Sequence, residues 1–262
     1  MFVRLMALLL LAGAASAGDG PEALIPVDLE LVLAVDTSRS MDYDELRLQR
    51  EGYAAALEHP AVTSALSMGR HGRTAIMYFE WGGPGRTRVL ANWTLVESAE
   101  DAAAIAQILR DEPIRGLRGT SISGAMREAA NFIETNRFDG TRKVIDISGD
   151  GPNNRGRPVV EARAEVAALG IEINGLPFMV KEPSGAYSIP DLDIYYETCV
   201  ITGPSAFVIP IFEMSRLVAS IRQKLVLEIS GLRPPARARV VPASATDCMI
   251  GEKMRMRRNQ LP

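Results

Sequence analysis

Three short segments of the chain carry oxygen-bearing side chains that could bind a metal ion. The first is the sequence D-T-S-R-S at residues 36–40, which directly follows the apolar run Leu29–Val35. It supplies one carboxylate and two serine hydroxyls at alternate positions. Hard oxygen ligands of this kind suit Mg²⁺, Mn²⁺ or Ca²⁺. The same segment also fits a polar turn in which the serines only cap the next helix.

Two later segments can complete such a site. Thr120, in the sequence R-G-T-S, lies just before a predicted helix, where its hydroxyl either caps that helix or points outward. Asp150, in the sequence S-G-D-G, follows a short apolar strand. Flanking glycines let the backbone turn tightly at both places and approach a ligand.

The elements that must position these segments alternate between strand and helix. Apolar and alternating runs predict strands at 29–35, 74–81, 89–96, 143–148, 171–180 and 206–209, and helical spacing predicts helices at 44–57, 98–111, 121–134, 158–169 and 212–229. The spacer G-G-P-G at 82–85 predicts an antiparallel hairpin at a sheet edge. The predicted fold class is α/β: a doubly wound, mostly parallel sheet with helices on both faces and one antiparallel edge strand. In such sheets ligands bind beyond the carboxyl ends of the strands.

Together these residues resemble the metal-ion-dependent adhesion site of von Willebrand factor A domains, which have D-x-S-x-S after the first strand, then a Thr, then an Asp. The resemblance covers about residues 28–230. It implies that Ser38, Ser40 and Thr120 ligate a divalent cation directly or nearly so, and that Asp36 and Asp150 act mostly through water. A metal with few direct carboxylates would keep a coordination position open for an acidic group of a partner.

The chain departs from that family pattern at several positions. Arg39 stands where many members have Gly, and Gly149 stands where Thr is usual before the Asp. We predict that Arg39, Asp42 and Asn153 form a partner-binding rim around the metal. The sequence T-C-V-I-T-G-P-S-A-F-V, at 198–208, is similar to that of a group of bacterial secreted A-like proteins whose role is not established.

Export is predicted from the first residues. A basic start, an apolar run and the sequence Ala15-Ser16-Ala17 fit a secretory signal peptide over residues 1–17, with a membrane anchor as the alternative. A linker at 18–27, an A-like domain at 28–231 and a tail at 232–262 would follow. We therefore expect a protein of the periplasm or the extracellular space, with no transmembrane segment once the signal is removed.

Charge and cysteine content narrow the choice of partner and compartment. The chain has 29 Lys and Arg against 32 Asp and Glu, a net charge of −3, which gives no general attraction to nucleic acid. Its two cysteines, Cys199 and Cys248, favour a disulfide that tethers the tail, because an even count is typical of exported chains. Two separate buried thiols are the alternative.

The leading hypothesis is a binding module and not an enzyme. We expect a divalent cation, Mg²⁺ before Mn²⁺ or Ca²⁺, that captures an Asp or Glu of a protein partner. A hydrolase using the metal or Ser121 is one alternative, disfavoured because the two histidines, His59 and His71, match no catalytic triad. A structural envelope component whose metal site has lapsed is another.

Overall fold

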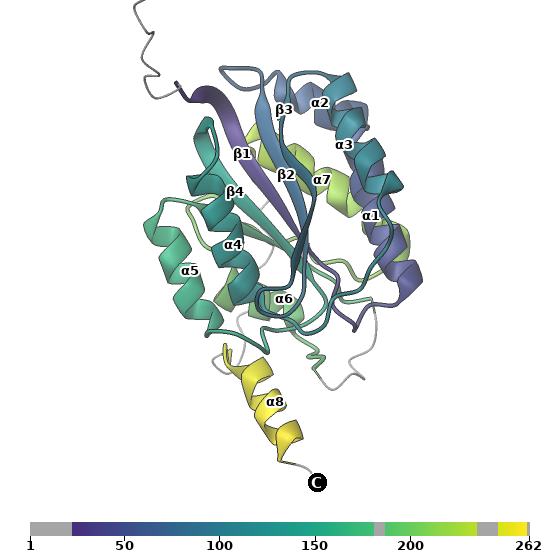
Figure 1. The fold of residues 1–262 in the computed structure, drawn as a ribbon, viewed down its shortest axis with the longest axis vertical. Coiled ribbons are helices and arrows are strands. Elements are labelled where there is room, and N and C mark those ends of the chain that lie inside the picture. Colours follow the sequence, from purple (N-terminus) through teal and green to yellow (C-terminus); the bar gives the residue numbers. More distant parts are fainter. Residues whose placement is uncertain (1–22, 181–186, 235–245, 261–262) are drawn as a thin grey trace, which may run out of the picture.

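The computed structural model describes residues 23–180, 187–234 and 246–260. A five-stranded sheet forms its centre, in the order β3-β2-β1-β4-β5 (Figure 1). β1 is parallel to β2 and β4, β5 is parallel to β4, and β3 pairs antiparallel with β2 at one edge. The predicted fold class is therefore confirmed. The strands are β1 (Ile25–Asp36), β2 (Thr74–Trp81), β3 (Thr87–Val96), β4 (Phe138–Gly149) and β5 (Glu172–Pro177).

Helices cover both faces of this sheet (Figure 1). One layer contains α1 (Tyr43–Leu57), α2 (Pro60–Leu66), α3 (Ala99–Asp111) and α7 (Leu217–Ser230). The other contains α4 (Ile122–Glu134), α5 (Val159–Ala168), α6 (Leu192–Tyr195) and a π-helical turn at Tyr196–Val200. A 3₁₀ turn, Met214–Arg216, leads into α7, and the last helix, α8 (Ile250–Asn259), is drawn in yellow at the bottom of Figure 1.

Strand β1 lies at the middle of the core and is buried on both faces. Its odd-numbered residues, such as Leu31 and Leu33, pack against the α1 layer, whereas Val32 and Ala34 pack against the α4 layer. This explains why its sequence is a continuous apolar run rather than an alternating one. The carboxyl end of the strand delivers Asp36 to the sheet edge.

Some predicted boundaries differ from the structure. The predicted strand at 206–209 forms only isolated bridges, Val208 with Gly175 and Ile211 with Phe178, because the intervening Pro210 has no amide hydrogen to donate to a ladder. The connection at 58–73 contains α2, which starts with Pro60 at the first helical position, a placement that proline favours.

The ends of the chain also differ from expectation. β1 begins at Ile25, inside the predicted linker, because Ile25 pairs with Phe138 of β4. The predicted signal peptide, residues 1–17, lies outside the described residues. Within the described ranges, no helix is both long and apolar enough to cross a membrane.

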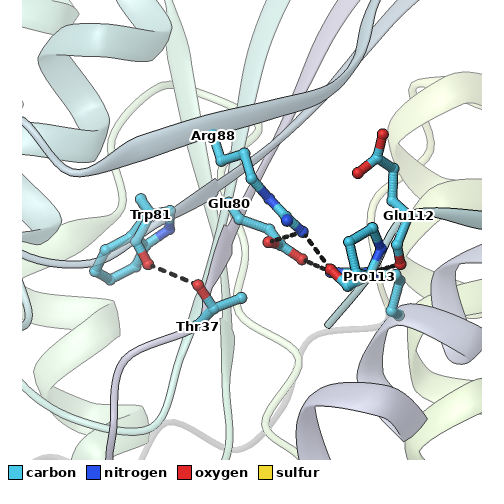
Figure 2. Close-up of polar contacts among 7 residues, drawn as sticks. Thr37, Glu80, Trp81, Arg88, Glu112 and Pro113 are labelled. Atoms are coloured by element: carbon cyan, nitrogen blue, oxygen red, sulfur yellow. Dashed lines mark hydrogen bonds and ion pairs between the residues drawn. The ribbon is translucent and has the colours of Figure 1, made fainter. Parts of the chain in front are cut away.

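A buried ionic cluster holds the polypeptide near the carboxyl end of β2. Glu80 is 1% exposed and contacts Arg50 of α1. It also contacts Arg88 of β3 at 2.9 Å (Figure 2). Arg88 also donates a hydrogen bond to the Pro113 carbonyl at 2.9 Å, and Arg50 donates one to the Glu112 carbonyl. The cluster therefore fastens the segment after α3 that leads toward Thr120.

A second buried cluster lies between β4 and α7. The ammonium group of Lys224 is 2.9 Å from Asp146 and contacts Glu228, and all three side chains are almost completely buried. Asn174 of β5 donates a hydrogen bond to Glu228 at 2.9 Å. Burial raises the pKa of Asp146 to about 7. The positive charge of Lys224 opposes this shift and the negative charge of Glu228 adds to it, since one lysine faces two carboxylates.

Replacing Glu80 by Ala should lower the free energy of unfolding by about 3–5 kcal/mol, because two guanidinium groups would lose their buried partner. The matched control is Glu97→Ala, which breaks the half-exposed pair between Glu97 and Arg73 and should cost less than about 1 kcal/mol. Chemical denaturation of both variants measures the difference. Equal losses would contradict a structural role for the Glu80 cluster.

Asp146 should make the protein less stable as the pH rises from about 4 to 7. In that range the folded chain holds a proton on Asp146 that the unfolded chain, with the ordinary pKa of 3.8, releases. The free energy of unfolding should fall by up to about 1.4 kcal/mol per pH unit. Asp146→Asn should flatten this dependence, whereas the exposed Asp139→Asn on the same strand should not. Denaturation at several pH values tests this.

Candidate metal centre

The first loop folds back on the carboxylate at the end of β1. Asp36 is completely buried, and one of its oxygens accepts a hydrogen bond from the Ser38 backbone amide at 2.7 Å. Its other oxygen accepts one from the Ser38 hydroxyl at 3.1 Å. The Ser38 and Ser40 hydroxyl oxygens are 2.9 Å apart. Three of the five predicted ligands thus form one continuous group of oxygens.

Asp150 joins this group from the end of β4. The Ser40 hydroxyl donates a hydrogen bond to Asp150 at 2.7 Å, across 110 residues of sequence. The parallel pairing of β1 with β4, in which Val35 lies opposite Ser148, brings the two carboxylates to the same edge. The structure therefore places Asp36, Ser38, Ser40 and Asp150 together.

The Thr120 loop lies beside both of these loops. The Leu117 amide donates a hydrogen bond to the Thr37 carbonyl at 2.7 Å, and the Thr120 carbonyl accepts hydrogen bonds from the Asn154 and Arg155 amides, each at 3.1 Å. Thr120 is 6% exposed. The helix cap is the neighbouring Ser121, whose hydroxyl accepts a hydrogen bond from the Gly124 amide. Thr120 is therefore left for a role other than capping.

The electrostatics of the group suit a cation. Burial raises the pKa of Asp36 well above its usual range, and the negative charge of Asp150 raises it further. In the part of the chain that the structure describes, no three His, Cys, Asp or Glu side chains gather as a metal cluster. Hydroxyl oxygens would have to complete the ligand set. Those of Ser38 and Ser40 lie against the two carboxylates, and Thr120 lies in the adjoining loop. The residues present fit a hard divalent cation.

Gly149 and Tyr196 explain one departure from the family pattern. A Cβ atom at Gly149 would lie 2.8 Å from the Tyr196 hydroxyl oxygen and 3.1 Å from an oxygen of Asp36. The space that a side chain would need is therefore taken by a buried phenol from the π-helical turn. Tyr196 lies next to the candidate site, although its sequence context suggests only a packing residue.

The three predicted rim residues have different positions. Arg39 is exposed, and Asp42 is the exposed N-cap of α1, where it forms a capping box with Glu45. Asn153, however, is 0% exposed. Its side chain accepts a hydrogen bond from the Ser123 amide at 3.0 Å and donates to the Arg157 carbonyl at 3.0 Å. The prediction of Asn153 as a rim residue is wrong because its amide group is used inside the protein.

A groove of about 440 Å³ opens beside the Thr120 loop, lined in part by Ser121, Ser123, Arg127 and Arg157. Ser121 is 1% exposed and its hydroxyl caps α4. His59 caps α2. The His71 amide donates hydrogen bonds to Asp28 before β2 begins, at the amino-terminal ends of the strands and therefore away from the candidate site. The geometry therefore adds no support to a hydrolase based on Ser121.

The predicted disulfide between Cys199 and Cys248 is present, with Cα atoms 5.5 Å apart. It joins the π-helical turn of Tyr196 to the residues just before α8. Sequence reasoning did not predict α8, and it missed Glu252, which is 4% exposed and contacts Asn153. The signal that could have indicated the helix is the cysteine itself, since a covalent tether favours an ordered neighbour.

Solved structures of low sequence identity share this fold. The pilus adhesin SpaC from Lactobacillus rhamnosus GG, in its open conformation, is 14% identical over 80% of this chain and 30% of its own, with a TM-score of 0.59. Proximal thread matrix protein 1 from the mussel byssus is 15% identical over 79% of this chain and 49% of its own, with a TM-score of 0.54. The chain thus spans half or less of the length of these two proteins.

A third structure is matched over nearly its whole length. The von Willebrand factor domain of the type V pili tip protein Mfa5 from Porphyromonas gingivalis is 11% identical over 82% of this chain and 99% of its own, with a TM-score of 0.53. At these identities the likeness shows the fold alone, and no curated protein has significant sequence similarity to the chain.

The family is shown by a match over most of the sequence. Residues 26–233 match the family described as "Protein of unknown function (DUF1194)". The match ends just after α7, so α8 and the cysteine before it lie beyond the matched segment. The chain belongs to this family, and its fold is that of a von Willebrand factor A domain.

Proposed function

We propose that the chain is an exported protein-binding module that depends on a divalent cation and that it is not an enzyme. The observation that carries the proposal is the continuous line of oxygen contacts of 2.7–3.1 Å from Asp36 through Ser38 and Ser40 to Asp150. Ser38, Ser40 and Thr120 would hold the cation, with the two carboxylates balancing its charge. A bound cation would supply a coordination position for a carboxylate of the partner.

The similar structures support the cation and the adhesive role. One structure of the mussel byssus protein is described as having a zinc-occupied MIDAS motif, with a TM-score of 0.52 to this chain. SpaC is described as a pilus adhesin, and Mfa5 as a pilus tip protein. For this chain we expect Mg²⁺ first, with Mn²⁺, Ca²⁺ or Zn²⁺ as alternatives. The disulfide supports export to the periplasm or the exterior, because disulfides persist in oxidising compartments.

Exposed arginines near the site support an acidic protein partner. Arg39, Arg118 and Arg155 come from the three loops that form the site, and all three are exposed. No carboxylate within the described ranges forms an ion pair with them. Arg155 packs across Gly119, next to Thr120: a Cβ at Gly119 would lie 2.7 Å from its Cδ atom. Guanidinium groups so placed could bind further carboxylates of a partner whose first carboxylate reaches the metal.

Calorimetric titration of the wild-type protein should show binding of Mg²⁺ or Mn²⁺. Asp36→Ala and Thr120→Ala should each weaken that affinity at least about tenfold, because each removes an oxygen from the group around the cation. Thr63→Ala, at a half-buried position of α2, is the matched control and should bind as the wild type does. A wild-type protein that takes up no divalent cation would refute the proposed site.

Carboxylate capture can be tested on a surface coated with a Gly-Asp-Gly peptide, with Gly-Asn-Gly as the matched surface. Binding should require both the Asp peptide and the cation, and it should disappear in EDTA. The double variant Arg118→Ala/Arg155→Ala should bind more weakly and with a smaller dependence on salt, while its cation affinity is unchanged.

The control for this second experiment is the double variant Arg70→Ala/Arg137→Ala. These exposed arginines precede β2 and β4, at the opposite edge of the sheet, so their loss should leave peptide binding unchanged. Equal effects of the two double variants would contradict a role for the arginines at the site. Equal binding to the Asp and Asn surfaces would contradict carboxylate capture.

A further inference from the structure

Helix α8 packs directly against the loop that follows Asp150. A Cβ atom at Gly251, in the first turn of α8, would lie 2.1 Å from the Asn153 carbonyl oxygen and 3.2 Å from the ring of Pro152. Only a residue without a side chain permits this approach, so the helix backbone touches the loop backbone. The contact begins two residues after a predicted metal ligand.

Glu252 adds a specific polar contact to this backbone packing. Its carboxylate accepts a hydrogen bond from the Asn153 side-chain amide at 2.6 Å. Both side chains are buried, Glu252 at 4% and Asn153 at 0% exposure. A buried hydrogen bond of this kind restricts the orientation of the amide group, because an unpaired buried donor would cost about 1–3 kcal/mol.

Asn153 connects this contact to both halves of the candidate metal centre. Its backbone amide donates to the Tyr195 hydroxyl at 3.2 Å, and its side-chain oxygen accepts from the Ser123 amide, three residues after Thr120. The next two amides, of Asn154 and Arg155, donate to the Thr120 carbonyl. The loop held by Glu252 therefore begins at Asp150 and is hydrogen-bonded through Asn154 and Arg155 to Thr120.

The disulfide fixes the start of α8 in this position. Cys248 precedes the helix by two residues, and its partner Cys199 lies in the same π-helical turn as Tyr196. Tyr196 in turn lies next to Asp36 and Gly149 at the base of the site. One covalent bond thus connects α8 to the turn that carries Tyr196, whose side chain borders the candidate site.

We propose that α8 is a positioning element of the metal centre, with Glu252 as the positioning residue and the Cys199–Cys248 disulfide as its anchor. Glu252 acts through Asn153, which sets the relative placement of Asp150 and Thr120. The inference rests on the proposed function for the metal itself. It also goes beyond the matched family, because α8 lies outside residues 26–233.

The test compares Glu252→Ala, Glu252→Gln and the control Lys253→Ala in the oxidised protein. Glutamine keeps an oxygen that can accept the Asn153 hydrogen bond, whereas alanine does not. Lys253 is the next residue of α8, and its partner is the exposed Asp247. Two quantities are measured: Mn²⁺ affinity by calorimetry, and amide hydrogen exchange of residues 153–155 and Ser123 in the metal-free protein.

Glu252→Ala should weaken Mn²⁺ binding about tenfold and speed exchange of the Asn154 and Arg155 amides, while Glu252→Gln stays within about threefold of the wild type and Lys253→Ala is unchanged. Reduction of the wild-type disulfide should change both quantities in the same direction as Glu252→Ala, and this measurement serves where that variant does not fold. The inference would be overturned if Glu252→Ala, or the reduced protein, had the same Mn²⁺ affinity and the same amide exchange rates as the oxidised wild type.

The two proposals fail in different ways. If the wild-type protein binds no Mn²⁺ and no Mg²⁺, the proposed function is refuted, and the exchange rates alone then decide whether Glu252 positions the loop. If the wild type binds the cation and Glu252→Ala binds it equally well, the metal site stands and the positioning role of α8 is refuted.

Discussion

The candidate site depends on the parallel register of β1 and β4. With Val35 opposite Ser148, the two strands end together, and Asp36 and Asp150 meet at the edge of the sheet. Burial raises the pKa of Asp36, and the negative charge of Asp150 raises it further. The Ser38 hydroxyl donates to Asp36 and the Ser40 hydroxyl donates to Asp150, which makes the arrangement tolerable without a cation and suitable for one.

Several buried contacts keep the loops around this pair from separating. Glu80 and its two arginines hold the segment after α3, and Figure 2 shows Glu80 and Arg88 beside Pro113 of that segment. The Thr37 carbonyl accepts a hydrogen bond from the Leu117 amide of the same segment. Since a buried charge without its partner is costly, such clusters fix one arrangement of the chain more than they add stability. The rigid body of the fold thus sets the loop positions, while exposed Arg39 and Arg155 remain accessible to a partner.

The C-terminal segment adds to a widespread fold at the place where function is expected. Residues 26–233 account for the sheet and its two helical layers, yet Asn153, in the loop after Asp150, is held by Glu252 from beyond that range. A disulfide-anchored helix thus supplies part of the support of this loop, and the redox state of the compartment would then influence the site.

The sequence by itself determined the fold class, the strand that carries Asp36 and the group of hydroxyls and carboxylates. The reason is that a continuous apolar run and the composition of a loop are local properties of the chain. It also indicated the disulfide, since two cysteines have few alternatives in a chain whose first residues predict export. It could not place Asn153, whose neighbours resemble those of any polar loop. The roles of Tyr196, Asn153 and Glu252 depend on contacts between residues that are 42 to 99 positions apart in the sequence, and only the tertiary structure decides which buried polar groups meet.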